Sequence, residues 1–197
     1  MYKKQIDIFD NEAEMWDAKG ASDCSENINK IINLSKIEKN HKILDVGTGT
    51  GIIVKNILKQ VGKGGYVKAI DISTKMIEVA NRKLTADNLD FTVDNIETIS
   101  DPDQTYDFII FNNVFPHIIN KDIAIKNAKR MLKNGGSIII SHLAGRDAVN
   151  NIHGGTSSFK EDRVPALWHW TKLLDEYNLR VELALDQVDF YYIIGRM

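Results

Sequence analysis

The chain has 197 residues, a length that suits one domain and leaves no room for two full ones. Lys and Arg number 25 against 27 Asp and Glu, and this balance removes the electrostatic basis for a protein built mainly to bind nucleic acid phosphates. The one cysteine, Cys24, excludes an intrachain disulfide and a zinc site of several thiols. The sequence shows neither the apolar region of a secretory signal nor an apolar run of membrane-spanning length, so we expect a cytoplasmic protein without a membrane partner.

Short apolar runs alternate along the chain with segments in which apolar residues recur at helical spacing. The apolar runs predict strands at 42–46, 66–72, 89–93, 106–111 and 137–141. The helical spacing predicts helices from Gly51 to the glycines at 62–65, from Ser73 or Thr74 onward, over 121–133 and over 166–177. We expect Asn134-Gly135-Gly136 to close the helix over 121–133. The late runs at 180–185 and 190–194, separated by a short polar turn, predict an antiparallel hairpin.

Strands that alternate with helices predict an α/β fold, because right-handed crossovers produce a parallel sheet covered by helices on both faces. We therefore expect a doubly wound, mostly parallel sheet that ends in the antiparallel hairpin. Such sheets bind ligands beyond the carboxyl ends of their strands, so the functional residues are expected there.

The segment from Asp45 to Gly51 places three glycines, Gly47, Gly49 and Gly51, between a predicted strand and a predicted helix. Glycines permit a tight turn and let a ligand approach the main chain closely. The spacing G-x-G-x-G differs from the G-x-G-x-x-G of dinucleotide enzymes and lacks the Lys-Ser/Thr of a nucleoside triphosphate loop. A purely structural turn is the alternative interpretation.

Asp71 ends the next predicted strand, about 20 residues beyond this loop, where an acid can accept hydrogen bonds from both hydroxyls of a ribose. The alternative is that Asp71 merely caps the helix that begins near Thr74. The loop and the acid together favour a nucleoside-binding site.

With these residues the chain resembles the class I S-adenosylmethionine-dependent methyltransferases, in particular their small-molecule, type 11-like branch with the D-x-G-x-G-x-G signature. The resemblance covers residues 40–141 well and implies a Rossmann-like fold that binds S-adenosylmethionine and releases S-adenosylhomocysteine. It implies one methyltransferase domain over 1–197, with an N-terminal helical lid (1–38), a cofactor-binding core (40–141), and a substrate-side cover with closing strands (142–197).

The resemblance also implies a role for individual residues. The loop residues Asp45, Gly47, Thr48, Gly49 and Gly51 would surround the methionine part of the cofactor, and Asp71 would bind its ribose. The adenine would contact Ile72, Met76, Asp94 and Asn95; Asn112 would lie next to the transferable methyl group, and Trp16 would belong to a segment folded over the cofactor. The alternatives are that Asp94 is a turn residue, that Asn112 satisfies backbone groups, and that Trp16 is a core aromatic.

Residues of the acceptor side are expected after the later strands. His117 and His142 follow strand ends and are the candidate catalytic residues, because a neutral imidazole accepts protons near pH 7. Arg146 could pair with a carboxylate or phosphate of the substrate, and His153 lies in the long connection 143–165, which we expect to cover the acceptor. Each histidine could instead be a surface residue. A metal site is disfavoured, because none of the histidines shows the close helical pairing of ligands.

The sequence therefore predicts an enzyme that methylates a small molecule at O, N or C by in-line displacement, as a monomer or a homodimer. A nucleic acid methyltransferase is the nearest alternative, although the segment from Asn112 to Pro116 departs from the Asn/Asp-Pro-Pro-aromatic motif of relatives that methylate bases. A nicotinamide oxidoreductase is disfavoured by the loop spacing. A non-catalytic module that only binds S-adenosylmethionine stays possible.

Overall fold

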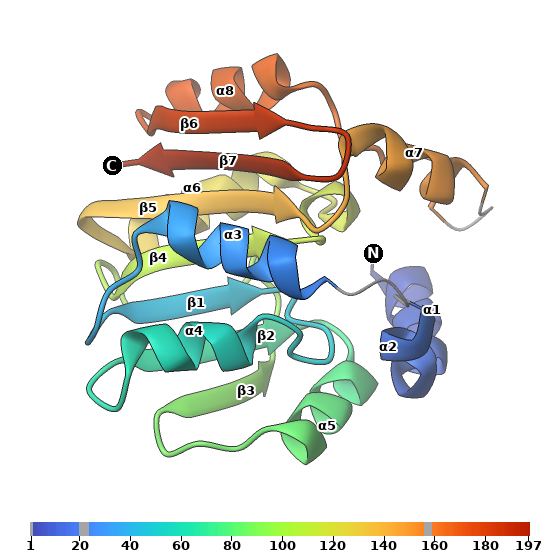
Figure 1. Ribbon diagram of the computed structural model, residues 1–197, viewed down its shortest axis with the longest axis horizontal. Helices are drawn as coiled ribbons and strands as arrows, with labels where there is room; N and C mark the ends of the chain where they lie inside the picture. Colours follow the sequence, from blue (N-terminus) through green and yellow to red (C-terminus); the bar gives the residue numbers. More distant parts are fainter. Residues whose placement is uncertain (1, 20–23, 156–158) are drawn as a thin grey trace. The chain divides into compact units, whose positions relative to one another are not determined.

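The computed structural model describes residues 2–19, 24–155 and 159–197. Their packing divides the chain into two units, Met1–Ser100 and Asp101–Met197, which are described one at a time. The seven strands have the order β3-β2-β1-β4-β5-β7-β6 (Figure 1). Strands later in the chain are thus added on one side of β1 as far as β3, and on its other side from β4 onward. The predicted α/β class is thus confirmed, with a doubly wound, mostly parallel sheet and a C-terminal antiparallel hairpin.

The first unit contains three parallel strands, a helix that precedes them and the two helices that connect them. The strands are β1 (Lys42–Val46), β2 (Tyr66–Asp71) and β3 (Leu89–Val93), and the helices are α3 (Ser25–Ser35), α4 (Val54–Val61) and α5 (Thr74–Lys83). Figure 1 shows α4 in front of β2, on which it packs. The predicted start of this helix at Gly51 is wrong by three residues, because the backbone N–H of Gly51 bonds to Thr48 O and keeps the chain in a turn before Val54.

Short N-terminal helices pack against α5. They are α1 (Lys3–Glu12), η1 (Ala13–Met15) and α2 (Trp16–Lys19), and Figure 1 shows them beyond the arrowheads of β1 and β2. An apolar cluster joins them to α5 through Ala13, Phe9 and Trp16 on one side and Met76 and Val79 on the other. Residue 1 and residues 20–23 of the predicted lid lie outside the described residues, as do residues 156–158 of the predicted cover.

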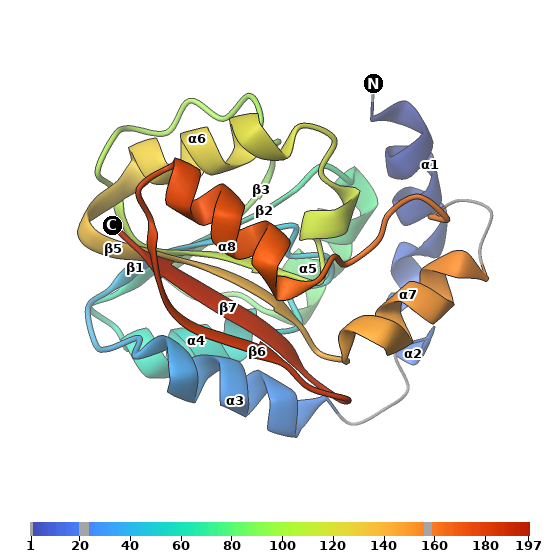
Figure 2. The same cartoon turned by 90° about the horizontal axis from the view of Figure 1, so that it is seen from above.

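The second unit contains the strands β4 (Tyr106–Asn112), β5 (Leu132–His142), β6 (Arg180–Asp186) and β7 (Tyr191–Arg196). β4 and β5 are parallel, whereas β6 and β7 form the predicted antiparallel hairpin. Its helices are η2 (Phe115–His117), α6 (Lys121–Met131), α7 (Arg146–Gly154) and α8 (Leu167–Glu176). Figure 2 shows α6 and α8 on the same side of these strands, and α7 beyond the carboxyl end of β5.

The predicted closure of the helix over 121–133 by Asn134-Gly135-Gly136 is wrong. α6 ends at Met131, and Leu132 already pairs with Tyr106 as the first residue of β5. The register then shifts, and regular pairing resumes between Phe108 and Ser137. Leu132 is fully buried, so its extended conformation adds an apolar side chain to the core, and the polar residues after it are accommodated in the irregular part of the strand.

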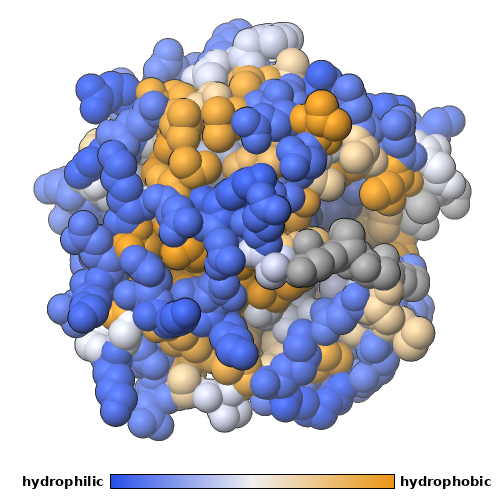
Figure 3. Space-filling view, viewed as in Figure 1, coloured by the Kyte–Doolittle hydropathy of each residue, from blue (hydrophilic) through white to orange (hydrophobic). Residues whose placement is uncertain are grey.

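No helix in the described part of the chain is long and apolar enough to cross a membrane. The face drawn in Figure 3 is mainly hydrophilic and carries separate apolar patches.

Candidate functional site

The glycine loop after β1 has a backbone that only glycine adopts without strain. Gly47, Gly49 and Gly51 have φ angles of 67°, 55° and 81°, in the left-handed region. The loop is fixed to the neighbouring strand, because the N–H of Thr48 donates to Ile70 O at 2.9 Å. The alternation of glycine with threonine in the sequence therefore reflects three positive φ angles within five residues.

Asp71, at the end of β2, ties this loop to the start of α5. Its Oδ2 accepts from the N–H of Gly49 at 2.9 Å, and its Oδ1 accepts from the N–H of Ser73 at 2.9 Å. Burial raises the pKa of Asp71, although these two N–H groups oppose the rise. Ser73, and not Asp71, is the N-cap of α5, since its hydroxyl accepts from the N–H of Met76 at 3.1 Å.

Asp45 and Thr48 supply buried polar atoms that other described residues do not satisfy. Asp45 Oδ2 and Thr48 Oγ1 are buried and have no hydrogen-bond partner in the part of the chain that the structure describes. The pKa of Asp45 is raised to about 7, and burial is the main cause. The nearby Thr48 hydroxyl opposes this rise, whereas the carboxylate of Asp71 adds to it. Such a pair suits a ligand group that is cationic and donates hydrogen bonds.

The residues expected around the adenine are held by local contacts. Asp94 Oδ1 accepts from the N–H of Asn95 at 2.7 Å, and Asn95 Oδ1 accepts from the N–H of Glu97 at 2.9 Å. Both side chains thus shape the turn after β3, while Met76 is buried in the apolar cluster and Ile72 is half-buried. Their contacts with a cofactor stay a prediction.

Trp16 lies over the glycine loop. A Cβ added to Gly49 would lie 3.9 Å from Trp16 Nε1, so the indole closely approaches the main chain there. The ring also packs edge-on against Phe9, with a centroid distance of 5.7 Å. This position is compatible with both predicted roles of Trp16, as a core aromatic and as part of a cover.

A bridge built by Lys83 joins the N-terminal helices to the loop, and the sequence did not indicate it. Lys83 Nζ donates to Asp17 Oδ2 at 2.6 Å and to Thr50 O at 3.0 Å. Thr50 Oγ1 donates to Asp17 Oδ1 at 2.5 Å, which closes a ring of three residues. Although burial raises the pKa of Asp17, the hydrogen bonds from Lys83 and Thr50 bring it below its ordinary value.

In the second unit, Asn112 and Asn113 join the ends of β4 and β5. Asn112 is buried and accepts from the hydroxyl of Ser141 at 3.1 Å, and Asn113 Oδ1 accepts from the N–H of Leu143 at 3.0 Å. The bond from Ser141 uses the side-chain oxygen of Asn112, and the alternative interpretation of Asn112 as a residue that satisfies backbone groups stays a prediction. Its place near a methyl group stays a prediction.

The structure brings two of the three predicted histidines of the second unit into ring contact. His117 Nδ1 lies 2.8 Å from Asp162 Oδ2, and His153 Nδ1 bonds to the backbone O of the same residue. The ring centroids of His117 and His153 are 5.0 Å apart, and Phe159 lies 4.8 Å from His117. Asp162 and Phe159 were not predicted, because no spacing in the sequence links them to His117.

His142 and Arg146 differ in environment. His142 is almost completely buried at the end of β5, and burial lowers its pKa to about 3, helped by His117 and His153. It is therefore neutral at physiological pH. Arg146 Nε donates to Asp186 Oδ2 at 2.8 Å, so a structural ion pair holds the guanidinium that the sequence predicted for the substrate.

Comparison with known proteins decides the family. A family model described as a methyltransferase domain matches residues 37–194. The chain belongs to the class I S-adenosylmethionine-dependent methyltransferases. The ubiquinone/menaquinone biosynthesis C-methyltransferases UbiE of Hydrogenovibrio crunogenus and Saccharophagus degradans are 33% and 34% identical to it over 113 residues, which is 55% of this chain. These matches span 44% and 45% of the relatives, less than half of their length.

Solved structures share the fold of this methyltransferase at low identity. A methyltransferase from Aquifex aeolicus is 22% identical with a TM-score of 0.73, and the similarity covers 86% of this chain and 88% of that chain. A chain from the complex between the Haloferax volcanii Trm112 methyltransferase activator and a methyltransferase is 16% identical with a TM-score of 0.78, covering 95% and 96%. These similarities concern the fold alone.

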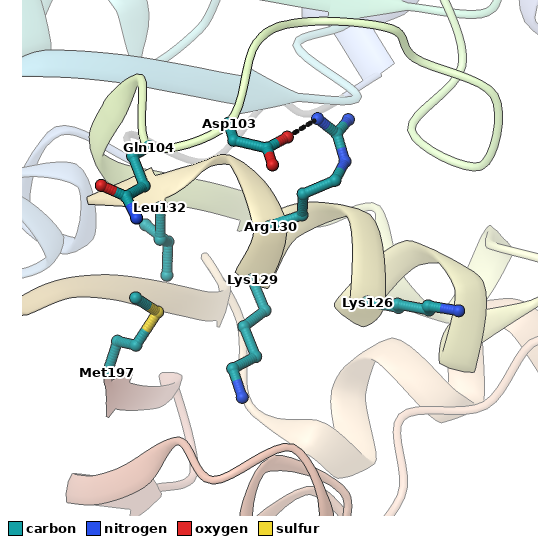
Figure 4. A pocket seen from close by; sticks show the side chains of 7 residues that line it. All are labelled: Asp103, Gln104, Lys126, Lys129, Arg130, Leu132 and Met197. Carbon is teal, nitrogen blue, oxygen red and sulfur yellow. Dashed lines mark hydrogen bonds and ion pairs between the residues drawn. The ribbon is translucent and has the colours of Figure 1, made fainter. Parts of the chain in front are cut away.

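A pocket of about 300 Å³ in the second unit of the methyltransferase lies away from its histidines. It is lined by Asp103, Gln104, Lys126, Lys129, Arg130, Leu132 and Met197. Figure 4 shows Arg130 turned to Asp103, to which it donates at 2.5 Å. Leu132 begins β5 and His142 ends it, so the pocket lies at the opposite end of the strand from the predicted acceptor residues. Among the described residues, no group of three or more His, Cys, Asp or Glu could hold a metal ion.

Replacement of Gly51 by Ala is expected to destabilise the methyltransferase more than the same change at Gly135. Both residues have positive φ, 81° and 77°, which costs about 1–2 kcal/mol for other residues. A Cβ at Gly51 would also lie 3.2 Å from Phe91 Cζ, whereas a Cβ at Gly135 would lie 3.6 Å from the end of the flexible Arg196 side chain, an ordinary contact distance. Urea unfolding of both variants measures the difference, and equal losses would show that the contact with Phe91 is irrelevant.

Replacement of Lys83 by Met is expected to weaken binding of S-adenosylhomocysteine about three- to tenfold, because half-exposed ion pairs contribute little but this one also holds the loop. Lys75→Met is the matched control, since Lys75 lies on the same helix and its ammonium group pairs with the exposed Glu78 and not with the loop. Isothermal titration calorimetry compares the two variants. An unchanged affinity in Lys83→Met, or an equal loss in Lys75→Met, would contradict a role of the bridge.

Proposed function

We propose that this methyltransferase binds S-adenosylmethionine at the loop of residues 45–51 and at Asp71, and transfers the methyl group to a small-molecule acceptor by in-line displacement. The observation that carries the proposal is the pair of N–H groups on Asp71, from Gly49 and Ser73. These bonds fix the carboxylate, and each oxygen keeps capacity for a further hydrogen bond. Two ribose hydroxyls need two such acceptors.

The surrounding residues fit the rest of the cofactor. Asp45 Oδ2 and Thr48 Oγ1, which no other described residue contacts by a hydrogen bond, suit the amino group of its methionine part, and the glycines let that part approach the main chain. We assign the adenine to Ile72, Met76, Asp94 and Asn95, the cover to Trp16, and the surroundings of the methyl group to Asn112. When bound, the cofactor supplies a methyl group on a positively charged sulfur. The protein then has to orient the acceptor and exclude water.

A small-molecule acceptor is supported by the name of the bacterial relatives, which are C-methyltransferases of ubiquinone and menaquinone biosynthesis. On this side we propose His117 and His142 as catalytic residues and His153 as a substrate contact. Arg146 is the weakest member of the set, because an acidic group of the acceptor has to compete with Asp186 for its guanidinium. The cytoplasmic location and the monomeric or homodimeric state stay predictions.

Isothermal titration calorimetry with S-adenosylmethionine, S-adenosylhomocysteine and NAD tests the proposal. We expect both sulfur compounds to bind and NAD not to bind. Tight binding of NAD alone would overturn it. Turnover of S-adenosylmethionine with a panel of metabolites and with RNA then separates the alternatives: activity on RNA alone indicates a nucleic acid methyltransferase, and binding without turnover favours a non-catalytic module.

A further inference from the structure

We infer that Asp162 is a positioning residue that sets His117 to take the proton of a hydroxyl group on a planar ring of the acceptor. The inference rests on the proposed function and deepens it, because it names a residue outside every sequence motif and the chemical class of the acceptor. His117 Nδ1 lies 2.8 Å from Asp162 Oδ2, and the two side chains are only 12% and 23% exposed. An ion pair or hydrogen bond this sheltered from water keeps its geometry better than a surface pair.

The backbone under His117 is rigid. η2 begins with Phe115, a fully buried residue whose ring packs edge-on against Phe111 at 5.0 Å and against Trp170 of α8 at 4.8 Å. The N–H of His117 also bonds to Val114 O. The imidazole therefore projects from a fixed turn, and its remaining freedom is rotation of the side chain, which the bond to Asp162 restricts.

Asp162 also fixes the proton arrangement of two rings at once. Its carboxylate accepts the Nδ1–H of His117, and its backbone carbonyl accepts the Nδ1–H of His153. In each ring this bond selects the tautomer with the proton on Nδ1, so acid–base chemistry falls to Nε2. Burial lowers the pKa of His153 and His117 lowers it further; the bond to the backbone of Asp162 opposes the fall but does not reverse it, so the neutral ring is favoured.

The cluster indicates what kind of acceptor needs such a base. An amine can attack with its own lone pair, whereas a ring hydroxyl reacts well only after it loses its proton. In the step that we infer, the O–H bond breaks, its proton passes to Nε2 of His117, and its electron pair stays on the oxygen. The rings of His117, His153 and Phe159 have centroids 4.8–5.8 Å apart and are tilted against one another by 43–59°, so they form an aromatic cluster that a planar ring of the acceptor would extend by a further edge contact.

The test uses 4-nitrophenol, whose absorbance changes when it ionises, with the full chain saturated with S-adenosylhomocysteine. Titratable or charged groups near His117 are Asp162, His153, the buried His142, and Arg163, which acts on His153. We expect the bound probe to ionise about tenfold more readily than the free probe in the wild type. Asp162→Asn should remove this effect, Asp162→Glu should restore part of it, and Asp175→Asn, an exposed change on α8 of the same unit, should retain it.

Nitrogen NMR of the histidine rings provides a readout that a merely structural role would not move. Asp162→Asn removes the carboxylate but keeps the backbone carbonyl, so the tautomer of His117 should change while that of His153 should not. Equal ionisation of the probe in wild type and Asp162→Asn, or no binding of the probe to the wild type, would overturn the inference. Binding of S-adenosylhomocysteine to the wild type is measured first by calorimetry. A wild type that does not bind this compound contradicts the proposed function and not the role of Asp162.

Discussion

Replacement of Asp71 by Asn is expected to weaken the binding of S-adenosylhomocysteine by about 100-fold or more. Hydrogen bonds to a charged group contribute about 1.5–3 kcal/mol each, and the ribose would lose two of them in their charged form. The amide nitrogen would in addition face the N–H of Gly49 or of Ser73, where a donor meets a donor. The glycine loop would then lose its bond to Asp71 and keep the bond from Thr48 to Ile70 O on β2.

Asp87→Asn is the matched control for this prediction. Asp87 is exposed in the loop before β3, and the change removes the same charge from the same unit. Calorimetry should give an unchanged affinity for this variant, and circular dichroism should show that both variants are folded. A loss of less than tenfold in a folded Asp71→Asn protein would exclude the carboxylate as the main anchor of the ribose.

Replacement of Asp45 by Asn is expected to stabilise the protein without its cofactor at high pH. The pKa of Asp45 is raised from 3.8 to about 7, so the folded chain holds a proton that the unfolded chain has lost between these values. The free energy of unfolding of the wild type therefore falls as the pH rises from about 4 to about 7, by up to about 4 kcal/mol. The variant lacks this fall, so its advantage should grow over that range and stay constant above it.

The same variant should bind S-adenosylhomocysteine about tenfold more weakly, because the buried carboxylate is the proposed partner of the amino group. Urea unfolding at pH 5 and pH 8 and calorimetry at pH 8 measure the two effects. Gain of stability with loss of affinity identifies Asp45 as a residue kept for binding. If the free energies of unfolding of the variant and the wild type differ by the same amount at pH 5 and at pH 8, Asp45 is not the buried acid that the structure describes.

The fold was largely predictable because most of its helices and strands have a clear local pattern of apolar and polar residues. Strands such as 42–46 are continuous apolar runs, and the hairpin of β6 and β7 follows from two runs with a polar turn. The end of α6 was not predictable in this way. Asn134-Gly135-Gly136 is a typical helix end, but burial of Leu132 and its pairing with Tyr106 decide the conformation, and both are tertiary effects.

In the candidate site, too, residues with a local signal in the sequence were predicted, and residues placed by tertiary packing were not. The glycines and Asp71 were found because a positive φ and a strand end leave a local signature in the sequence. Lys83, which lies 33 residues from Thr50, and Asp162, which lies 45 residues from His117, leave none. Their side chains are ordinary surface residue types, and only the packing of α5 and of the segment after α7 brings them to their partners.

The most direct test of the account is a crystal structure of the protein with S-adenosylhomocysteine. We expect both ribose hydroxyls to donate to Asp71, with the methionine part along the main chain of residues 47–51 and its amino group at Asp45. A ribose bound elsewhere, or an Asp71 carboxylate that contacts only the backbone of Gly49 and Ser73, would contradict it.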